Sequence, residues 1–125
     1  MVPHLVKEIR DASGRVIKTI EPREFGRPIS GGTAGELTQM MISVVQAGTG
    51  TAAQIPGVQV AGKTGTAETS SGKPHAWFVS FAPANDPKVV VAVVVLNGGS
   101  LGSEATGGAV AAPIARAVIE AALKG

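Results

Sequence analysis

An unbroken apolar run from Val89 to Leu96 constrains the fold of this chain more than any other feature. A strand with one face in water alternates polar and apolar residues, and this run contains no polar residue. A strand formed from it must therefore be covered on both faces. The run is far shorter than the ~20 residues that a membrane-spanning helix needs. We therefore expect a strand of a sheet that lies between helices.

The first part of the chain predicts a hairpin and then a helix. Residues 1–22 hold two extended runs, and Asp11-Ala12-Ser13-Gly14 between them has the composition of a turn. Apolar residues at helical spacing predict a helix over 33–48, with Thr33 and Glu36 as a capping box at its start.

The second part predicts three strands over 58–96, and the short turns between them make these strands antiparallel. An apolar stripe predicts a C-terminal helix over 107–123, with a kink at Pro113. The two predicted helices are the available covers for the apolar strand. The expected fold class is therefore α+β, an antiparallel sheet covered by helices on both faces.

Composition argues against several kinds of site. The net charge of +2 is spread along the chain without a basic run, and three phenylalanines and one tryptophan are too few for a base-stacking surface. We therefore expect no nucleic-acid partner. The chain has no cysteine and only two histidines, so we expect no metal site and no cofactor.

The segment from Gly57 to Thr64 matches the nucleotide-binding P-loop, G-x-x-x-x-G-K-T. That motif needs a flexible loop followed by a helix whose N–H groups bind phosphate. Here Val58-Gln59-Val60 favours a strand, and the residues after Thr64 have no helical periodicity. A P-loop-like nucleotide-binding domain is thus an alternative that the neighbouring residues disfavour.

A second pattern, Ser70-Ser71-Gly72-Lys73, matches the S-x-x-K of serine acyltransferases. The chemistry of that motif needs a helical turn that sets serine and lysine on one face. Gly72 and the following Pro74 disfavour a helix, so we expect a polar hairpin loop here.

The third pattern is Lys63-Thr64-Gly65-Thr66 on an extended strand. The two-residue period places both threonines on one face, and Lys63 and Gly65 on the other. The two hydroxyls can donate to a carboxylate, Lys63 adds positive charge, and Gly65 leaves room for an extended ligand. Taken alone, Lys-Thr-Gly favours an ordinary exposed edge strand with a solvated lysine.

Longer stretches distributed over the chain decide how the Lys63 region is interpreted. In order, these stretches are Pro3–Val6, Val44–Ala52, Val60–Glu68, Ala76–Pro83 and Ala112–Ala115. With them the chain resembles the C-terminal part of the transpeptidase domain of penicillin-binding proteins, most closely the class B, monofunctional members. The resemblance implies that residues 1–125 form a partial β-lactamase/transpeptidase-like fold that lacks its N-terminal half.

The resemblance also implies roles for the residues of the Lys63 strand. Lys63 and Thr66 would be catalytic, because Lys63 would face the catalytic serine and the Thr66 backbone N–H would be an oxyanion-hole donor. Thr64, Gly65 and Thr66 would bind the substrate or a β-lactam. The S-x-x-K and S-x-N of the family lie upstream of the matched region. This chain is therefore expected to supply the Lys-Thr-Gly strand but not the nucleophile, and to be inactive alone.

The function implied is that of a D,D-transpeptidase, which binds penicillin and cross-links peptidoglycan through a serine acyl-enzyme. Its partners would be the stem peptide, β-lactams, and either the remainder of its own protein or a second copy of the chain. The location implied is extracytoplasmic, in the cell envelope, with a membrane anchor in a longer protein and no anchor or signal in this chain. A serine β-lactamase or β-lactam sensor fragment and a noncatalytic peptide-binding module remain alternatives.

Overall fold

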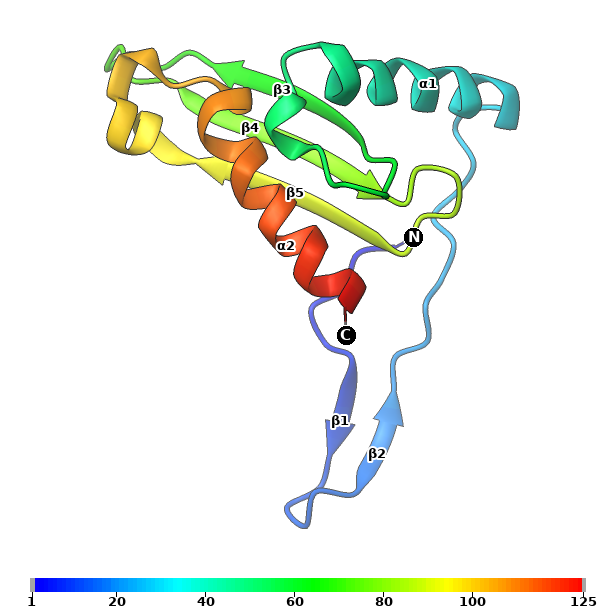
Figure 1. Ribbon diagram of the computed structural model, residues 1–125. Coiled ribbons are helices and arrows are strands. Elements are labelled where there is room, and N and C mark those ends of the chain that lie inside the picture. The colour runs from blue at the N-terminus through cyan, green and yellow to red at the C-terminus, as the bar shows by residue number, and fades with distance from the viewer. Residues whose placement is uncertain (1, 125) are drawn as a thin grey trace. The chain divides into compact units, whose positions relative to one another are not determined.

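The computed structural model describes residues 2–124. The chain divides into two compact units between Gly31 and Gly32 (Figure 1). The first unit contains a two-stranded hairpin. The second contains a three-stranded sheet and most of the helical residues.

The hairpin consists of β1 (Glu8–Arg10) and β2 (Val16–Thr19), which pair antiparallel within the region where the sequence predicts it. Its turn is held by Asp11, whose carboxylate accepts from Ser13 Oγ at 2.6 Å and from the Arg15 backbone N–H at 3.0 Å. These bonds, with that of the Ser13 hydroxyl first, lower the pKa of the Asp11 carboxyl. Gly14 completes the turn at φ 84°, a conformation that favours glycine.

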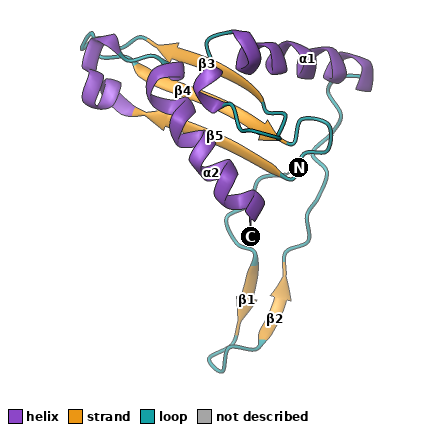
Figure 2. Cartoon of the chain, viewed as in Figure 1, coloured by secondary structure: helices purple, strands orange, loops and turns teal. Residues whose placement is uncertain are grey.

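The larger sheet consists of β3 (Ala61–Ala67), β4 (His75–Ala82) and β5 (Val89–Val95). The strands are antiparallel and lie in the order β3-β4-β5 (Figure 2). The predicted fold class, α+β with an antiparallel sheet and helices, is confirmed.

One face of this sheet forms the core together with α2 (Ala112–Lys124), which crosses the strands in Figure 1. Phe78 from β4 and Ile119 from α2 are fully buried there, and each contributes roughly 1.5–3 kcal/mol by burial. Small residues on the helix let it lie close to the strands. The buried members of this core are Val45, Ala53, Val60, Phe78, Ala82, Val91, Ala111, Ala112, Ala115 and Ile119.

The helical segment before the C-terminus differs from its prediction. Instead of one helix over 107–123 kinked at Pro113, the structure has a π-helical turn, Gly107–Ala111, and then α2. The Thr106 hydroxyl caps the turn by accepting from the Ala109 N–H at 3.2 Å. The helical residues run without a break from Gly107 to Lys124, and the change from π-helical to α-helical bonding falls at Ala112, immediately before Pro113.

The first helix, α1 (Gly31–Ala47), begins two residues before the predicted capping box, so Thr33 lies inside its first turn. Its C-terminal carbonyls are satisfied by Gln54, whose Nε2 donates to the oxygens of Val45 and Gln46 at 2.9 Å each. Ile42 packs with Ala61 at one end of the sheet.

The sheet face on which Ile42 packs, opposite the face covered by α2, is otherwise largely exposed in this chain. Trp77 and Val79 on β4 are each 41% exposed, and Val94 on β5 is 39% exposed. On the core face of β5 only Val91 is buried, with Val89, Val93 and Val95 partly buried, whereas Val90, Ala92 and Val94 on the other face are exposed. Within the described residues, the cover expected on both faces of this strand is therefore incomplete.

Candidate functional site

The strand β3 is an edge strand, because among residues 2–124 only β4 pairs with it. Lys63, Thr64, Gly65 and Thr66 lie in its central and last parts. An edge strand presents backbone N–H and C=O groups that an extended ligand can pair with. The four predicted site residues thus lie together on a strand suited to a peptide-like ligand.

The strand register fixes the face on which each side chain lies. Lys63 is opposite Val79, on the partly exposed face of the sheet. Thr64 is opposite Phe78, on the core face. The alternation expected from the two-residue period is present, and the lysine and the threonines leave the strand in opposite directions.

Lys63 is exposed, and its Nζ donates to the Thr64 backbone carbonyl at 2.5 Å. This bond holds the exposed ammonium group beside the strand. Its positive charge acts where an anionic ligand along β3 would lie.

The two site threonines have different surroundings. Thr64 is half-buried, and its Oγ1 lies 2.7 Å from the Oγ1 of Thr49, a hydrogen bond between residues 15 positions apart. Thr66 is exposed near the end of the strand. The Thr64 hydroxyl is thus held by the protein, whereas the Thr66 side chain faces solvent.

The two glycines of the strand have different reasons to be glycine. A Cβ at Gly62 would lie 2.5 Å from the Phe78 ring, so Gly62 is needed for core packing. A Cβ at Gly65 would meet only the Trp77 Cβ, at an ordinary 3.4 Å. The packing of this chain therefore does not require glycine at Gly65, which agrees with a role in admitting a ligand.

Sequence reasoning did not assign Thr49, Gly107 or Gly108 to the site. A Cβ at Gly107 would lie 2.1 Å from the Trp77 carbonyl oxygen, and one at Gly108 would lie 2.1 Å from the Thr49 carbonyl oxygen. The turn before α2 therefore lies directly against the site strands. The only sequence signals were a glycine doublet and a threonine between two glycines.

The two competing patterns do not form the structures that their chemistry needs. Gly62, Lys63 and Thr64 lie inside β3, so the P-loop match has no phosphate-binding loop and no following helix. The Ser70–Lys73 segment is a turn between β3 and β4, with Gly72 at φ 69°. It is the predicted polar loop and does not place a serine beside a lysine on a helix.

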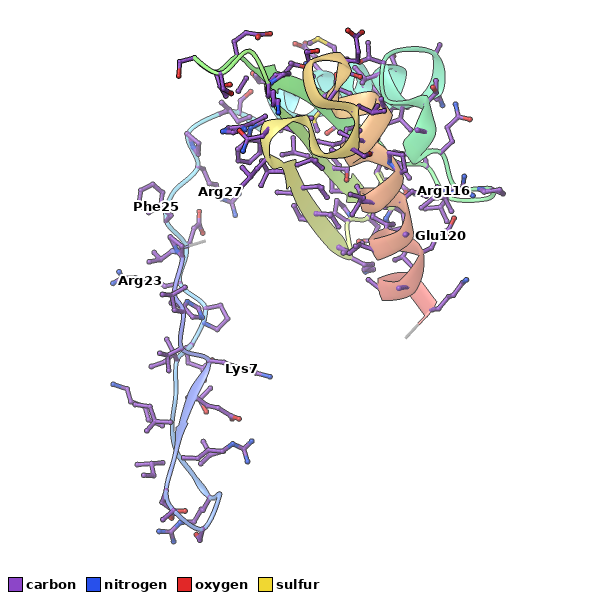
Figure 3. The ribbon with its side chains drawn as sticks, turned by 90° about the vertical axis from the view of Figure 1, so that its left-hand side faces the viewer. Lys7, Arg23, Phe25, Arg27, Arg116 and Glu120 are labelled. Carbon is purple, nitrogen blue, oxygen red and sulfur yellow. The ribbon has the colours of Figure 1, made fainter. Side chains whose placement is uncertain are left out.

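A separate cavity of about 590 Å³ lies between the end of α1, residues 54–60 and Arg116 of α2. The Arg116 Nε donates to Glu120 Oε1 at 2.8 Å (Figure 3), and this bond lowers the pKa of the Glu120 carboxyl. The polar walls of the cavity are glutamines and this paired arginine, which offer neither a nucleophile nor a general base.

Residues 2–124 contain neither a metal-binding cluster nor a single helix that could span a membrane. No cluster of three or more histidine, cysteine, aspartate or glutamate side chains could hold a metal ion. No single helix is long and apolar enough to cross a membrane, and Leu96–Glu104 with Gly107–Lys124 reaches that length and composition only as a pair bent by 118°.

Comparison with known proteins assigns these features to one family. Residues 1–120 match the family model of the penicillin binding protein transpeptidase domain. The peptidoglycan D,D-transpeptidase PbpA of Mycobacterium tuberculosis is 47% identical over an alignment of 129 positions, which covers 100% of this chain and 26% of that protein.

Solved structures of penicillin-binding protein A from M. tuberculosis have the same fold as this chain. In its ceftriaxone acyl-enzyme complex, the TM-score is 0.83 at 46% identity, with 97% of this chain and 28% of that chain covered. In its penicillin G acyl-enzyme complex, the TM-score is 0.80 at 46% identity, with 97% and 27% covered. This chain thus spans about a quarter of the length of the curated relative, at 26%.

Proposed function

The chain belongs to the penicillin-binding protein transpeptidase family, and from that membership we propose that it forms the Lys-Thr-Gly wall of a D,D-transpeptidase site. The observation that carries this proposal is the edge strand β3, which presents Lys63 and Thr66 to solvent in a chain that aligns over its whole length with PbpA. The nucleophilic serine would come from a part of the domain outside the matched quarter.

In this proposal the ligand is a D-Ala-D-Ala stem peptide or a β-lactam, and it lies along the free edge of β3. Its carboxylate accepts from the hydroxyls of Thr64 and Thr66, and Gly65 admits the ligand backbone. A carboxylate is an acceptor only, so two hydroxyl donors and a nearby ammonium match it chemically.

The proposed reaction begins when the serine oxygen attacks the carbonyl carbon next to the scissile bond. Negative charge develops on the carbonyl oxygen, and the Thr66 backbone N–H donates to it. The bond to the leaving amine then breaks, the amine takes up the proton that the serine hydroxyl lost, and the acyl group stays on the serine. Lys63 faces that serine, where its charge favours the oxygen anion. The location proposed for this chemistry is the extracytoplasmic side of the cell envelope.

The test uses a chimera in which this chain replaces the matching quarter of M. tuberculosis PbpA. The intact mass after incubation with penicillin G should increase by one penicillin, with the adduct on the PbpA part. An adduct on Ser70 would contradict the proposal. Continuous release of hydrolysed penicillin would favour the β-lactamase alternative.

Variants of the chimera test the individual roles. Lys63→Ala and Thr66→Val should slow acylation by about 10- to 100-fold, since each removes a bond or charge at an ionised group. Lys73→Ala is the matched control, because it removes a lysine of the β3–β4 turn outside the proposed site. Equal acylation rates in Lys63→Ala, Thr66→Val and the control would refute the assignment.

A further inference from the structure

The hydroxyl groups of Thr49 and Thr64 form a hydrogen bond in which Thr49 is a residue without an assigned role. Their Oγ1 atoms are 2.7 Å apart, the usual length of a bond between two hydroxyls. Thr49 lies in the turn that follows α1, and Thr64 lies on the candidate site strand. The contact therefore joins the end of α1 to the core face of β3, at the strand that carries the candidate site.

The turn that carries Thr49 is held from several sides. The backbone N–H groups of Gly48 and Gly50 both donate to the Val44 carbonyl, at 3.1 Å and 3.0 Å. A Cβ at Gly50 would lie 3.1 Å from the Phe78 ring, and one at Gly108 would lie 2.1 Å from the Thr49 carbonyl oxygen. The turn thus has little room to move, so the backbone from which the Thr49 side chain extends is held in place.

Each threonine hydroxyl has one proton to donate. If Thr64 donated that proton to Thr49, the ligand carboxylate would face only lone pairs of Thr64. If Thr49 donates instead, the Thr64 proton is free for the carboxylate, and the first bond polarises the second.

We propose that Thr49 is a positioning residue, which donates to Thr64 Oγ1 and directs the Thr64 proton toward the ligand carboxylate. This inference rests on the proposed function, because it takes the ligand to be a carboxylate bound along β3. Thr49 itself does not touch the ligand. Its effect passes through the orientation and polarity of the Thr64 hydroxyl.

The experiment compares Thr49→Val with Thr49→Ser in the chimera described above. Valine keeps the shape of threonine and removes the hydroxyl, whereas serine keeps the hydroxyl. The rate of acylation is measured with penicillin G and with its methyl ester, which lacks the carboxylate. Thr49→Val should slow acylation by penicillin G about 3- to 10-fold and change the rate with the ester by less than about twofold. Thr49→Ser, which keeps the hydroxyl, should react with penicillin G at about the rate of the unsubstituted chimera.

A double-mutant cycle separates positioning from a purely structural effect. If Thr49 acts through Thr64, the variant with both Thr49→Val and Thr64→Val should acylate no more slowly than Thr64→Val alone. Additive losses, an equal loss with the ester, or no loss in Thr49→Val would each overturn the inference. If the unsubstituted chimera forms no acyl-enzyme at all, the proposed function itself fails, and the two failures are thereby distinguished.

Discussion

Replacing Gly107 by alanine should destabilise the fold through a single steric conflict. Gly107 does not have the positive φ that by itself favours glycine, so the new methyl group is the only change to consider. That methyl carbon would lie 2.1 Å from the Trp77 carbonyl oxygen, 2.9 Å from the Gly65 carbonyl oxygen and 3.0 Å from the Gly65 nitrogen. All three are backbone atoms of the sheet and cannot rotate away.

The magnitude follows from the distance by which the turn must move. A contact at 2.1 Å falls roughly 1.3 Å short of 3.4 Å, where ordinary contacts begin, so the Gly107–Ala111 turn must separate from the strands by a similar distance. That movement loosens the fully buried Ala111 and Ala112 against the core. We expect a loss of about 3 kcal/mol in the free energy of unfolding, at the upper end of the usual cost of overpacking.

The assay is urea unfolding of the chain at one fixed protein concentration, followed by the fluorescence of its single tryptophan, Trp77. Gly35→Ala is the matched control, because Gly35 lies in α1 and no atom beyond its own stretch of helix backbone comes within 4 Å of the added Cβ. The control should gain about 0.5–1 kcal/mol from better helix propensity. If Gly107→Ala unfolds within about 0.5 kcal/mol of the unsubstituted chain, the steric reasoning is wrong.

The remaining predictions concern the core, the exposed face and the effect of pH. Phe78→Ala should cost about 3–5 kcal/mol in urea unfolding, because the ring is fully buried at the centre of the core; an unchanged midpoint would contradict this. Ser80→Ala should be neutral or stabilise by about 1 kcal/mol, since the buried Ser80 Oγ has no hydrogen-bond partner among residues 2–124; a clear loss of stability would show an unrecognised partner. Val79→Lys should reduce self-association of the chain in light scattering, because Val79 lies on the exposed apolar face; unchanged association would place the contact elsewhere. The Arg116 hydrogen bond lowers the pKa of Glu120 below its ordinary 4.5. The stabilisation by this pair is therefore complete above that pH and is lost as the pH falls through the lowered pKa. NMR titration of Glu120 should show the lowered pKa in the parent sequence and a higher pKa in Arg116→Ala.

The local parts of the fold could be predicted because neighbouring residues carry their own physical reasons. Asp11 and Gly14 predict the hairpin turn, since a short carboxylate side chain and a residue tolerant of positive φ are what such a turn needs. The opposite directions of Lys63 and Thr64 follow from strand geometry alone. The helix details were less accurate, because α1 starts at Gly31, before the predicted cap, and the periodicity does not mark the π-helical bonding of Gly107–Ala111.

The candidate site was only half readable from the sequence. The Lys63–Thr66 strand could be recognised because its residues are contiguous, and the family because five such contiguous stretches follow one another along the chain. Thr49 could not be assigned, because its bond to Thr64 exists only after the end of α1 is brought against β3.

By itself, the sequence determined the family, the antiparallel strands and the face on which each site side chain lies, since these depend on contiguous motifs and on the periods of strand and helix. Only the tertiary structure decided why Gly62 differs from Gly65, why Gly107 and Gly108 are glycines, and which hydroxyl holds Thr64. Those answers depend on which distant backbone and ring atoms come within contact distance, and close packing fixes that only when the whole unit is assembled.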